Sequence, residues 1–231
     1  MGSFPPGFRA LVIGASGAIG SAFEALLKSH PECAAVEGIH RRSQPPIDFD
    51  EEESIAEAAA ALAAKAPFHL IINAAGLLHS PRFMPEKELG SLHYGQMLET
   101  FRANAFGPAM VIRHFSPLLD AQRGVMAVVS AKVGSIEDNR LGGWYSYRAS
   151  KAALNMILKT ASIEIKRTNR NAVLVALHPG TVNSRLSQPF RGARLGRSPE
   201  EAAADMLRVI DGLVPCDTGR FYSYSGEQLP W

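Results

Sequence analysis

The sequence has little cysteine, little excess charge and no long apolar run. Its two cysteines, Cys33 and Cys216, stand far apart in 231 residues, so they cannot build a disulfide framework and favour a reduced, cytosolic setting. The net charge of +2 offers no electrostatic case for a nucleic-acid partner or a membrane surface. The longest apolar stretches have only the length of a strand, and residues 1–8 lack the pattern of a secretory signal. We therefore expect a cytoplasmic protein with no nucleic-acid or membrane partner.

Signatures of metalloenzymes and of serine hydrolases are also missing. The seven histidines are scattered and there is no HExxH motif, so we expect no metal site. The sequence contains no GxSxG elbow, and Ser130 is not followed by a matching glycine, which argues against a serine hydrolase.

What the sequence does contain is a regular alternation of short apolar runs with helical stretches. Strands are expected at 8–13, 35–39, 47–49, 68–73, 125–130, 172–177 and 220–224. One helix is expected to end at about residue 28, and others are expected at 53–66, 96–119, 146–168 and 198–213. Pro108 is expected to kink or divide the helix at 96–119. The alternation predicts an α/β fold: one Rossmann-type doubly wound domain over residues 1–231, with a mostly parallel sheet of about seven strands and helices on both faces.

Residues 184–197 form the one long irregular segment late in the chain. The segment carries two glycines and four arginines, which are Arg185, Arg191, Arg194 and Arg197. Loops of this length are uncommon unless they have a function. A mobile lid over a site is one interpretation, and a solvated surface loop is the other.

A glycine-rich turn joins the first expected strand to the first expected helix. Gly14, Gly17 and Gly20 are spaced GxxGxxG, close to but different from the GxGxxG dinucleotide fingerprint. Where side chains are absent, backbone N–H groups and the positive end of the helix can approach a pyrophosphate. The spacing also fits an ordinary tight turn, but its position at the first strand–helix junction favours a dinucleotide site.

The second expected strand ends in Arg41 and Arg42 and not in an acidic residue. An acid at this place would bind the ribose hydroxyls of NAD, whereas an arginine suits the extra phosphate of NADP. A solvated basic turn is the alternative. Asp48, after the next apolar run, could accept a hydrogen bond from the adenine amine or could be a loop or capping residue.

Tyr147 and Lys151 are four residues apart in an expected helix, so they share one face. A free tyrosine has a pKa of about 10, and a nearby cation brings it toward the working range of a proton donor or acceptor. Tyr94 and Tyr145 have no lysine four residues later. Taken alone, the pair also fits an ordinary surface contact on a helix.

These motifs occur together in one order, and the set resembles the short-chain dehydrogenase/reductase family. The resemblance extends from Ala10 to Gly180 and rests on Gly14-x-x-Gly17-x-x-Gly20, Asn73-Ala74-Ala75-Gly76, Asn104, Ser130, Tyr147-x-x-x-Lys151 and Pro179-Gly180. The residues from 130 to 151 and the ending 226–231 resemble the branch near C-factor-like proteins and sniffer-type carbonyl reductases.

The resemblance implies a role for each matching residue. Ser130 would hydrogen-bond the substrate oxygen, and Tyr147 would be the general acid/base. Lys151 would bind the nicotinamide ribose and lower the pKa of Tyr147, and Asn104 would anchor a water that links this lysine to solvent. With Arg41, Arg42 and Asp48, the residues expected to hold the cofactor are Gly14, Ser16, Gly17, Ala18, Ile19, Gly20, Asn73, Ala74, Ala75, Gly76, Tyr147, Lys151, Pro179, Gly180 and Val182.

Two features depart from the family pattern. The glycine spacing resembles that of extended members, although the chain is too short for their added substrate domain. Members that bind NADP often have a basic residue just before the middle glycine, where this sequence has Ser16. The choice of cofactor therefore depends on Arg41 and Arg42.

The expected function is that of an NADP(H)-dependent oxidoreductase that interconverts a small carbonyl and its alcohol by hydride transfer. NAD(H) stays open as cofactor, as does a homodimer or homotetramer as assembly. A catalytically silent dinucleotide-binding sensor or signalling protein on the same fold is the alternative.

Overall fold

The computed structural model describes residues 1–190 and 192–231. The described chain forms one sheet of six parallel strands: β1 Phe8–Ile13, β2 Cys33–Ile39, β3 Leu70–Asn73, β4 Val125–Val129, β5 Val173–His178 and β6 Arg220–Ser223. Their spatial order is β2-β1-β3-β4-β5-β6. The chain thus winds outward from β1 to β2, returns to β3, and continues in the opposite direction. This confirms the doubly wound Rossmann-type fold and puts the topological switch point between β1 and β3.

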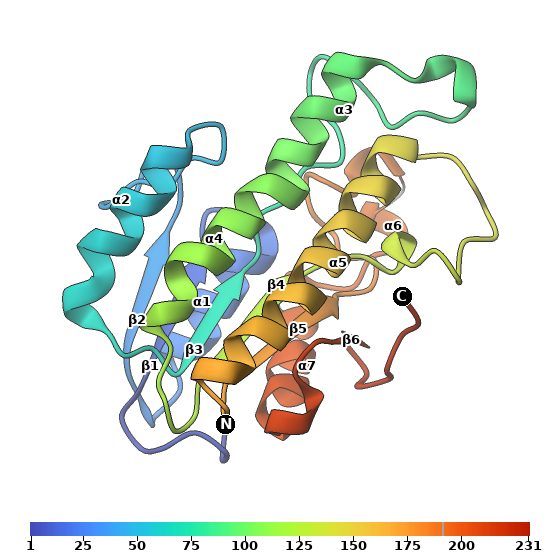
Figure 1. The fold of residues 1–231 in the computed structure, drawn as a ribbon. Helices are drawn as coiled ribbons and strands as arrows, with labels where there is room; N and C mark the ends of the chain where they lie inside the picture. Colours follow the sequence, from blue (N-terminus) through green and yellow to red (C-terminus); the bar gives the residue numbers. More distant parts are fainter. Residues whose placement is uncertain (191) are drawn as a thin grey trace.

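Helices cover both faces of the sheet (Figure 1). Along β1, Ala10 and Val12 face one apolar layer, while Leu11 and Ile13 face the other, because successive side chains of a strand point to opposite sides. The first layer packs under α1 Ala18–Lys28 and α7 Pro199–Gly212. The second packs under α2 Glu52–Leu62, α4 Gly107–Phe115 and α5 Tyr145–Thr168, which lie in front of the sheet in Figure 1. Burial on both faces explains why the central strands β3, β4 and β5 are continuous apolar runs.

The strand expected at 47–49 is not formed, so that prediction was wrong and the described sheet has six strands instead of about seven. Pro45 and Pro46 have no N–H groups to offer a neighbouring strand. The Ile47 N–H donates to His40 O at 3.2 Å, and the Asp48 N–H donates to Ser54 Oγ at 3.0 Å. The apolar run reflects burial of the Ile47 side chain in the second layer and not a strand ladder.

The helix expected at 96–119 is divided, as the proline predicted, but the division lies one turn before Pro108. α3 Tyr94–Phe101 leads into a π-helical turn, Arg102–Phe106, and then into α4. A proline ring clashes with the carbonyl of the residue four positions earlier in a regular helix. The wider π turn is where the helix accommodates it, and this turn contains Asn104.

Short helical turns end or link the main elements. α2 continues as a 3-10 turn, Ala63–Lys65, and stops before Pro67. The predicted start of α7 is confirmed, since Ser198 and Glu201 form a reciprocal capping box. The segment 184–197 is less irregular than expected, with a 3-10 turn Gln188–Phe190 and a short helix α6 Gly192–Leu195. The other 3-10 turns are Leu89–Ser91, Ser116–Leu118, Lys132–Gly134 and Pro215–Asp217.

Across residues 1–190 and 192–231, every helix is too short or too polar to cross a membrane.

Candidate active site

The predicted site residues gather at the edge of the sheet where the parallel strands end. Gly14 follows β1, Asn73 is the last residue of β3, Ser130 follows β4, and Pro179 follows β5. Parallel strands present their carboxyl ends along one edge, which is where ligands bind in open α/β sheets. α5 carries Tyr147 and Lys151, and it reaches the same edge because Lys151 Nζ bonds the carbonyl of Val129, the last residue of β4.

The three glycines of the first turn differ in the space around them. Gly14 has a φ of +84°, and a Cβ there would lie 2.9 Å from the Ala75 nitrogen. A Cβ on Gly20 would lie 2.1 Å from the Gly14 oxygen, so this glycine lets α1 pack against the turn. A Cβ on Gly17 would meet only the Gly14 oxygen, at 3.3 Å. The fold therefore demands Gly14 and Gly20, whereas a Cβ on Gly17 would make a single close contact.

The start of α1 is free to face an anion. Gly17 is the N-cap residue and no described side chain caps the helix there. The first N–H groups of a helix have no intrahelical partners, and with the helix dipole they attract negative charge. The first turn contains Ala18, Ile19 and Gly20. A phosphate group fits this arrangement.

The turn after β3 is shaped by Asn73. Its Oδ1 accepts a hydrogen bond from the Ala75 N–H at 3.1 Å, while its Nδ2 is buried with no partner among the described residues. Gly76 follows, and a Cβ on it would lie 3.4 Å from Asn104 Oδ1 and 3.6 Å from Lys151 Nζ. Asn73, Ala74, Ala75 and Gly76 thus form a small-residue turn directly beside the two buried polar groups.

Tyr147 and Lys151 are both buried on α5, at 8% and 3% exposure. Lys151 Nζ donates to the Val129 carbonyl at 3.0 Å, and burial lowers the pKa of Lys151 to about 8. Burial also raises the pKa of Tyr147 above its usual range. This direction is opposite to the lowering expected from the spacing, because the ammonium group turns to a carbonyl and desolvation of the phenolate dominates. At neutral pH the phenol is protonated and able to donate.

Asn104 links three parts of the site. Its Oδ1 accepts from the Leu77 N–H at 2.8 Å, and its Nδ2 donates to the Leu77 carbonyl at 2.7 Å and to Ser150 Oγ at 3.1 Å. Ser150 Oγ in turn donates to the Tyr147 carbonyl at 2.8 Å. The buried amide therefore joins the loop after β3, the π-helical turn and the first turns of α5.

Ser130 has a partner that the sequence analysis missed. Its buried hydroxyl donates to Asn155 Oδ1 at 2.7 Å, and Asn155 Nδ2 is buried without a partner in the described chain. Asn155 continues the four-residue spacing of Tyr147 and Lys151 along α5, so the sequence did carry a signal for it.

Glu86 was also missed, and its sequence neighbourhood carries no signal for a role here. The side chain is 3% exposed, and its carboxylate accepts hydrogen bonds from the N–H of Ser146, at 3.2 Å, and from the Ser146 hydroxyl. Its backbone carbonyl accepts from the Trp144 N–H. Trp144, the N-cap residue of α5, has a φ of +55° and no side-chain cap of its own. Glu86 therefore caps the helix that carries Tyr147.

The remaining predicted cofactor residues lie around this centre. Arg41 and Arg42 are exposed in the turn after β2, and neither pairs with a carboxylate in the described part of the chain. Asp48 follows the loop, and its Oδ1 accepts from the Asp50 N–H at 3.1 Å, as a turn residue does. Asp48 therefore lies in a local turn, and its contact with an adenine amine stays a prediction.

The segment after β5 is held at both ends. Pro179 is followed by Gly180, whose φ is +75° and where a Cβ would lie 2.8 Å from the Tyr224 ring. Val182 is buried and bridges to Arg197. The Arg197 N–H donates to the Thr181 carbonyl at 3.0 Å, and its guanidinium group lies 4.3 Å from the centre of the Tyr224 ring. The two ends of this loop are therefore joined to each other by the contacts of Thr181 and Val182 with Arg197.

The loop between these ends lies over Tyr147. Phe190 packs on Trp144 with ring centres 4.9 Å apart, and Trp144 packs edge-on against Tyr147 at 6.2 Å. Of the four arginines that drew attention to this segment, Arg191 lies outside the described residues. The contacts of Phe190 put the segment in the position of a cover for the site.

A parallel doubly wound sheet with a glycine-rich turn at its first helix, and a buried tyrosine and lysine at the same edge, defines a dinucleotide-dependent oxidoreductase. The model of the short chain dehydrogenase family matches residues 9–194. The chain belongs to this family.

Relatives and solved structures agree with this assignment. The chain is 34% identical over 188 residues to a 1-hydroxy-2-glutathionyl-2-methyl-3-butene dehydrogenase of Rhodococcus, covering 81% of this chain and 80% of that one. It is 41% identical over 145 residues to the C-signal protein of Myxococcus xanthus, covering 62% and 83% of the two chains. The NADPH-bound carbonyl reductase from chicken fatty liver superposes with a TM-score of 0.82 at 25% identity, over 96% and 98% of the chains. The carbonyl reductase Sniffer of D. melanogaster shares the fold, with a TM-score of 0.84 at 20% identity over 98% and 100%. The likeness to C-signal confirms the expected relation to C-factor-like proteins, and the likeness to Sniffer shows a shared fold.

Proposed function

We propose that this oxidoreductase uses NADP(H) to interconvert a small carbonyl compound and its alcohol, with Tyr147 as the general acid/base. The observation that carries the proposal is the joint burial of Ser130, Tyr147 and Lys151 at the strand edge that also holds the glycine-rich turn. Burial of titratable groups in a site with shifted pKa values is typical of catalytic centres.

The residues present fit a dinucleotide. The uncapped start of α1 would bind the pyrophosphate, the small-residue turn after β3 would lie along the cofactor, and Pro179, Gly180 and Val182 would border the nicotinamide end. The unpartnered amide group of Asn73 offers a donor beside that turn. Lys151 Nζ can exchange the Val129 carbonyl for ribose hydroxyls, which are also acceptors.

When bound, NADPH supplies the hydride that reduces the carbonyl carbon. Ser130 would turn its hydroxyl from Asn155 to the substrate oxygen and hold it beside Tyr147. Tyr147, protonated at neutral pH because burial raises its pKa, would give its proton to that oxygen. The carbon thus gains a hydride and the oxygen a proton, and the reverse direction returns both. Once its ammonium group leaves the Val129 carbonyl, Lys151 would stabilise the phenolate that the transfer leaves.

Arg41 and Arg42 support NADPH over NADH. Both guanidinium groups are exposed after β2, where they can meet the 2′-phosphate with charge-assisted hydrogen bonds. The carbonyl reductase with the TM-score of 0.82 was solved with NADPH bound, which supports the same choice.

A silent signalling or sensor protein is the second candidate, and the likeness to C-signal favours it. Ser130, Tyr147 and Lys151 are all present and buried, which favours catalysis instead. The two functions make different demands on these residues, since a sensor needs the dinucleotide cradle and not the proton donor.

The test follows NADPH absorbance in the presence of a panel of aldehydes, ketones and quinones, with NADPH binding measured separately by fluorescence. Consumption with one or more carbonyls is the expected result. Binding without consumption, for every carbonyl in the panel, would favour the sensor. Absence of binding by both NADPH and NADH would contradict both candidates.

A further inference from the structure

Tyr147 is covered by an apolar cluster that is separate from the two layers of the core. Leu78, Ala131 and Tyr147 are its buried members, and the partly buried side chains packed against them are Val133, Trp144, Leu186 and Phe190. They come from the loops after β3 and β4, from the start of α5 and from the segment after β5. Four separate parts of the chain thus supply apolar groups to one place beside the proton donor.

Aromatic rings form one wall of this cluster. Trp144 meets Tyr147 edge-on, with an interplanar angle of 75°, and Phe190 packs against Trp144 at 59°. His79 lies beyond Phe190 at 6.0 Å, and its Nε2 contacts the Arg185 carbonyl at 3.1 Å. The cover is therefore attached to the rest of the site by ring contacts and by one imidazole nitrogen.

The side chains packed against Tyr147 here are apolar or aromatic, and the neighbouring charged residue, Arg148, directs its guanidinium group to the backbone carbonyls of Gly143 and Val133. A charged or heavily hydroxylated group placed among these side chains would lose water without gaining partners, which is unfavourable. A flat apolar group would instead gain edge-on or offset contacts with the rings of Trp144 and Phe190. Aliphatic groups of the same size would gain burial alone.

We propose that the substrate carries an aromatic ring bonded directly to its reacting carbonyl carbon, and that Trp144 and Phe190 select for this ring. The inference rests on the proposed function, because it assumes reduction at Tyr147. The carbonyl oxygen then lies at Ser130 and Tyr147, and the ring lies against Trp144 and Phe190.

The test compares two ketones of similar size, acetophenone and cyclohexyl methyl ketone, as substrates of the full chain with NADPH. We expect kcat/KM to be about threefold to tenfold higher for acetophenone than for cyclohexyl methyl ketone. Benzaldehyde and cyclohexanecarbaldehyde form a second matched pair, in which the aromatic compound should be preferred in the same way. Phe190→Leu keeps an apolar side chain and removes the ring, so it should bring both ratios toward one. Trp144→Phe keeps a ring at the left-handed position and should retain most of the preference. Tyr94→Leu, a change of an exposed aromatic residue at the start of α3, should leave the ratios unchanged.

The outcomes separate the two levels of the proposal. Equal kcat/KM within both pairs, or a preference for the cyclohexyl compounds, overturns the aromatic specificity and leaves the reductase function intact. An aromatic preference that survives Phe190→Leu together with Trp144→Leu overturns the assignment of the wall. Failure to reduce any carbonyl overturns the proposed function, and the substrate class falls with it.

Discussion

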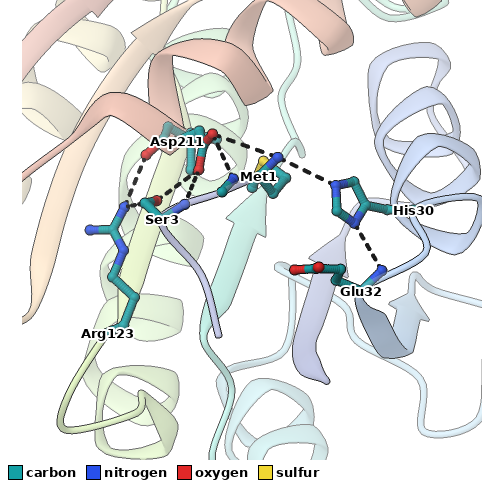
Figure 2. Close-up of polar contacts among 8 residues, drawn as sticks. Met1, Ser3, His30, Glu32, Arg123 and Asp211 are labelled. Carbon is teal, nitrogen blue, oxygen red and sulfur yellow. Dashed lines mark hydrogen bonds and ion pairs between the residues drawn. The ribbon is translucent and has the colours of Figure 1, made fainter. Parts of the chain in front are cut away.

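The two edges of the parallel sheet differ in how fully their polar groups are hydrogen-bonded. At the edge where the strands begin, Asp211 at the end of α7 accepts hydrogen bonds from the N–H groups of Gly2 and Ser3, both at 2.9 Å, and from Ser3 Oγ at 2.7 Å. The Met1 ammonium lies 3.6 Å away (Figure 2). At the edge where the strands end, Asn73 Nδ2 and Asn155 Nδ2 are buried without partners in the described chain.

The pKa shifts follow the same division. Burial alone would raise the pKa of Asp211, but the hydrogen bonds from Ser3 and Gly2 and the Met1 ammonium outweigh it and lower the pKa. Burial acts unopposed at the other edge, raising the pKa of Tyr147 and lowering that of Lys151 to about 8. At one edge, Asp211 has enough hydrogen-bond partners to keep its charge and to stabilise the fold. At the other edge, buried polar groups lack such partners, which is typical of a binding site.

At the edge where the strands begin, one buried polar group also lacks a partner among the described residues. Arg123 donates to Ser3 Oγ at 2.8 Å and to the Leu213 carbonyl at 2.9 Å, and its guanidinium lies 4.7 Å from the Phe4 ring centre (Figure 2 shows its link to Ser3). Its Nε is buried with no partner among residues 1–190 and 192–231. The difference between the edges thus lies in Asp211, whose charge is stabilised by its partners, and in Tyr147 and Lys151, whose charged forms are disfavoured by burial.

The largest effect is expected from Tyr147→Phe at the carboxyl edge. It removes only the oxygen that transfers the proton, so kcat should fall by about 10² to 10⁴, the contribution of a general acid. NADPH affinity should be unchanged because the ring remains. Steady-state kinetics and a fluorescence titration check the two values. Retention of most of the activity would reject Tyr147 as the acid/base.

A double change of Arg41→Ala and Arg42→Ala should weaken NADPH binding by roughly 10-fold to 100-fold, the loss expected for one or two charge-assisted hydrogen bonds. NADH lacks the 2′-phosphate, so its dissociation constant should change little. Isothermal titration with both cofactors decides the point. If the wild-type protein binds NADH as tightly as NADPH, the two arginines do not set the preference.

The desolvated lysine should make stability depend on pH in the absence of cofactor. The pKa of Lys151 is about 8 in the folded chain, below its ordinary 10.5, so between these values the unfolded chain binds the proton more tightly. Raising the pH from 8 to 10 should therefore increase the free energy of unfolding by about 2 kcal/mol. Above pH 10 the raised pKa of Tyr147 acts in the opposite direction. Urea unfolding should show the rise, and Lys151→Met should remove it.

Glu86→Ala should lower kcat by roughly tenfold, because about 1 to 2 kcal/mol of capping no longer holds the first turn of α5 and Tyr147 loses its fixed position. Glu86→Gln keeps an acceptor for Ser146 and should recover most of the activity. The KM for NADPH should stay the same in both variants, since the dinucleotide cradle lies on other elements. Equal kcat in Glu86→Ala and the wild type would make the cap a purely structural feature.

The smallest effect on activity is expected at the other edge. Asp211→Ala should lower the free energy of unfolding by roughly 1 kcal/mol at pH 7, a modest value because the carboxylate is partly exposed, and should leave kcat within about twofold. The pKa of Asp211 is lowered in the folded chain, so its contribution is present above the ordinary value of 3.8 and is lost as the pH falls through the folded pKa. Unfolding of both proteins at pH 7 and pH 3 measures this, and a large loss of kcat would contradict the comparison of the two edges.

Most of the elements could be predicted because their signals are local. The alternation of Ala10, Leu11, Val12 and Ile13 between two layers depends on neighbours in the chain and on the geometry of a strand. The cap of α7 at Ser198 depends on a residue three positions later. The run at 47–49 was misread because an apolar residue is needed equally for a strand and for a buried loop.

The site was predicted in part for the same reason. Tyr147 and Lys151 are one helical turn apart, so their shared face follows from the sequence. Glu86 and Ser146 are 60 residues apart, and no local pattern signals their contact. The helical spacing puts Asn155 on the face of Tyr147 and Lys151, but its contact with Ser130, 25 residues away, depends on how α5 packs beside β4. The direction of the Tyr147 pKa shift was also missed, because it depends on how completely the phenol is buried.

The sequence by itself determined the α/β alternation, the glycine turn at the first helix, the proline-induced division before α4 and the tyrosine–lysine pair, since each depends on residues within about one turn of one another. Only the tertiary structure decided which polar groups meet and how much water reaches them. It left the Asp211 charge fully partnered at one edge and removed water from Tyr147 and Lys151 at the other. Desolvation and long-range hydrogen bonds arise from the packing of distant segments, and no local pattern encodes them.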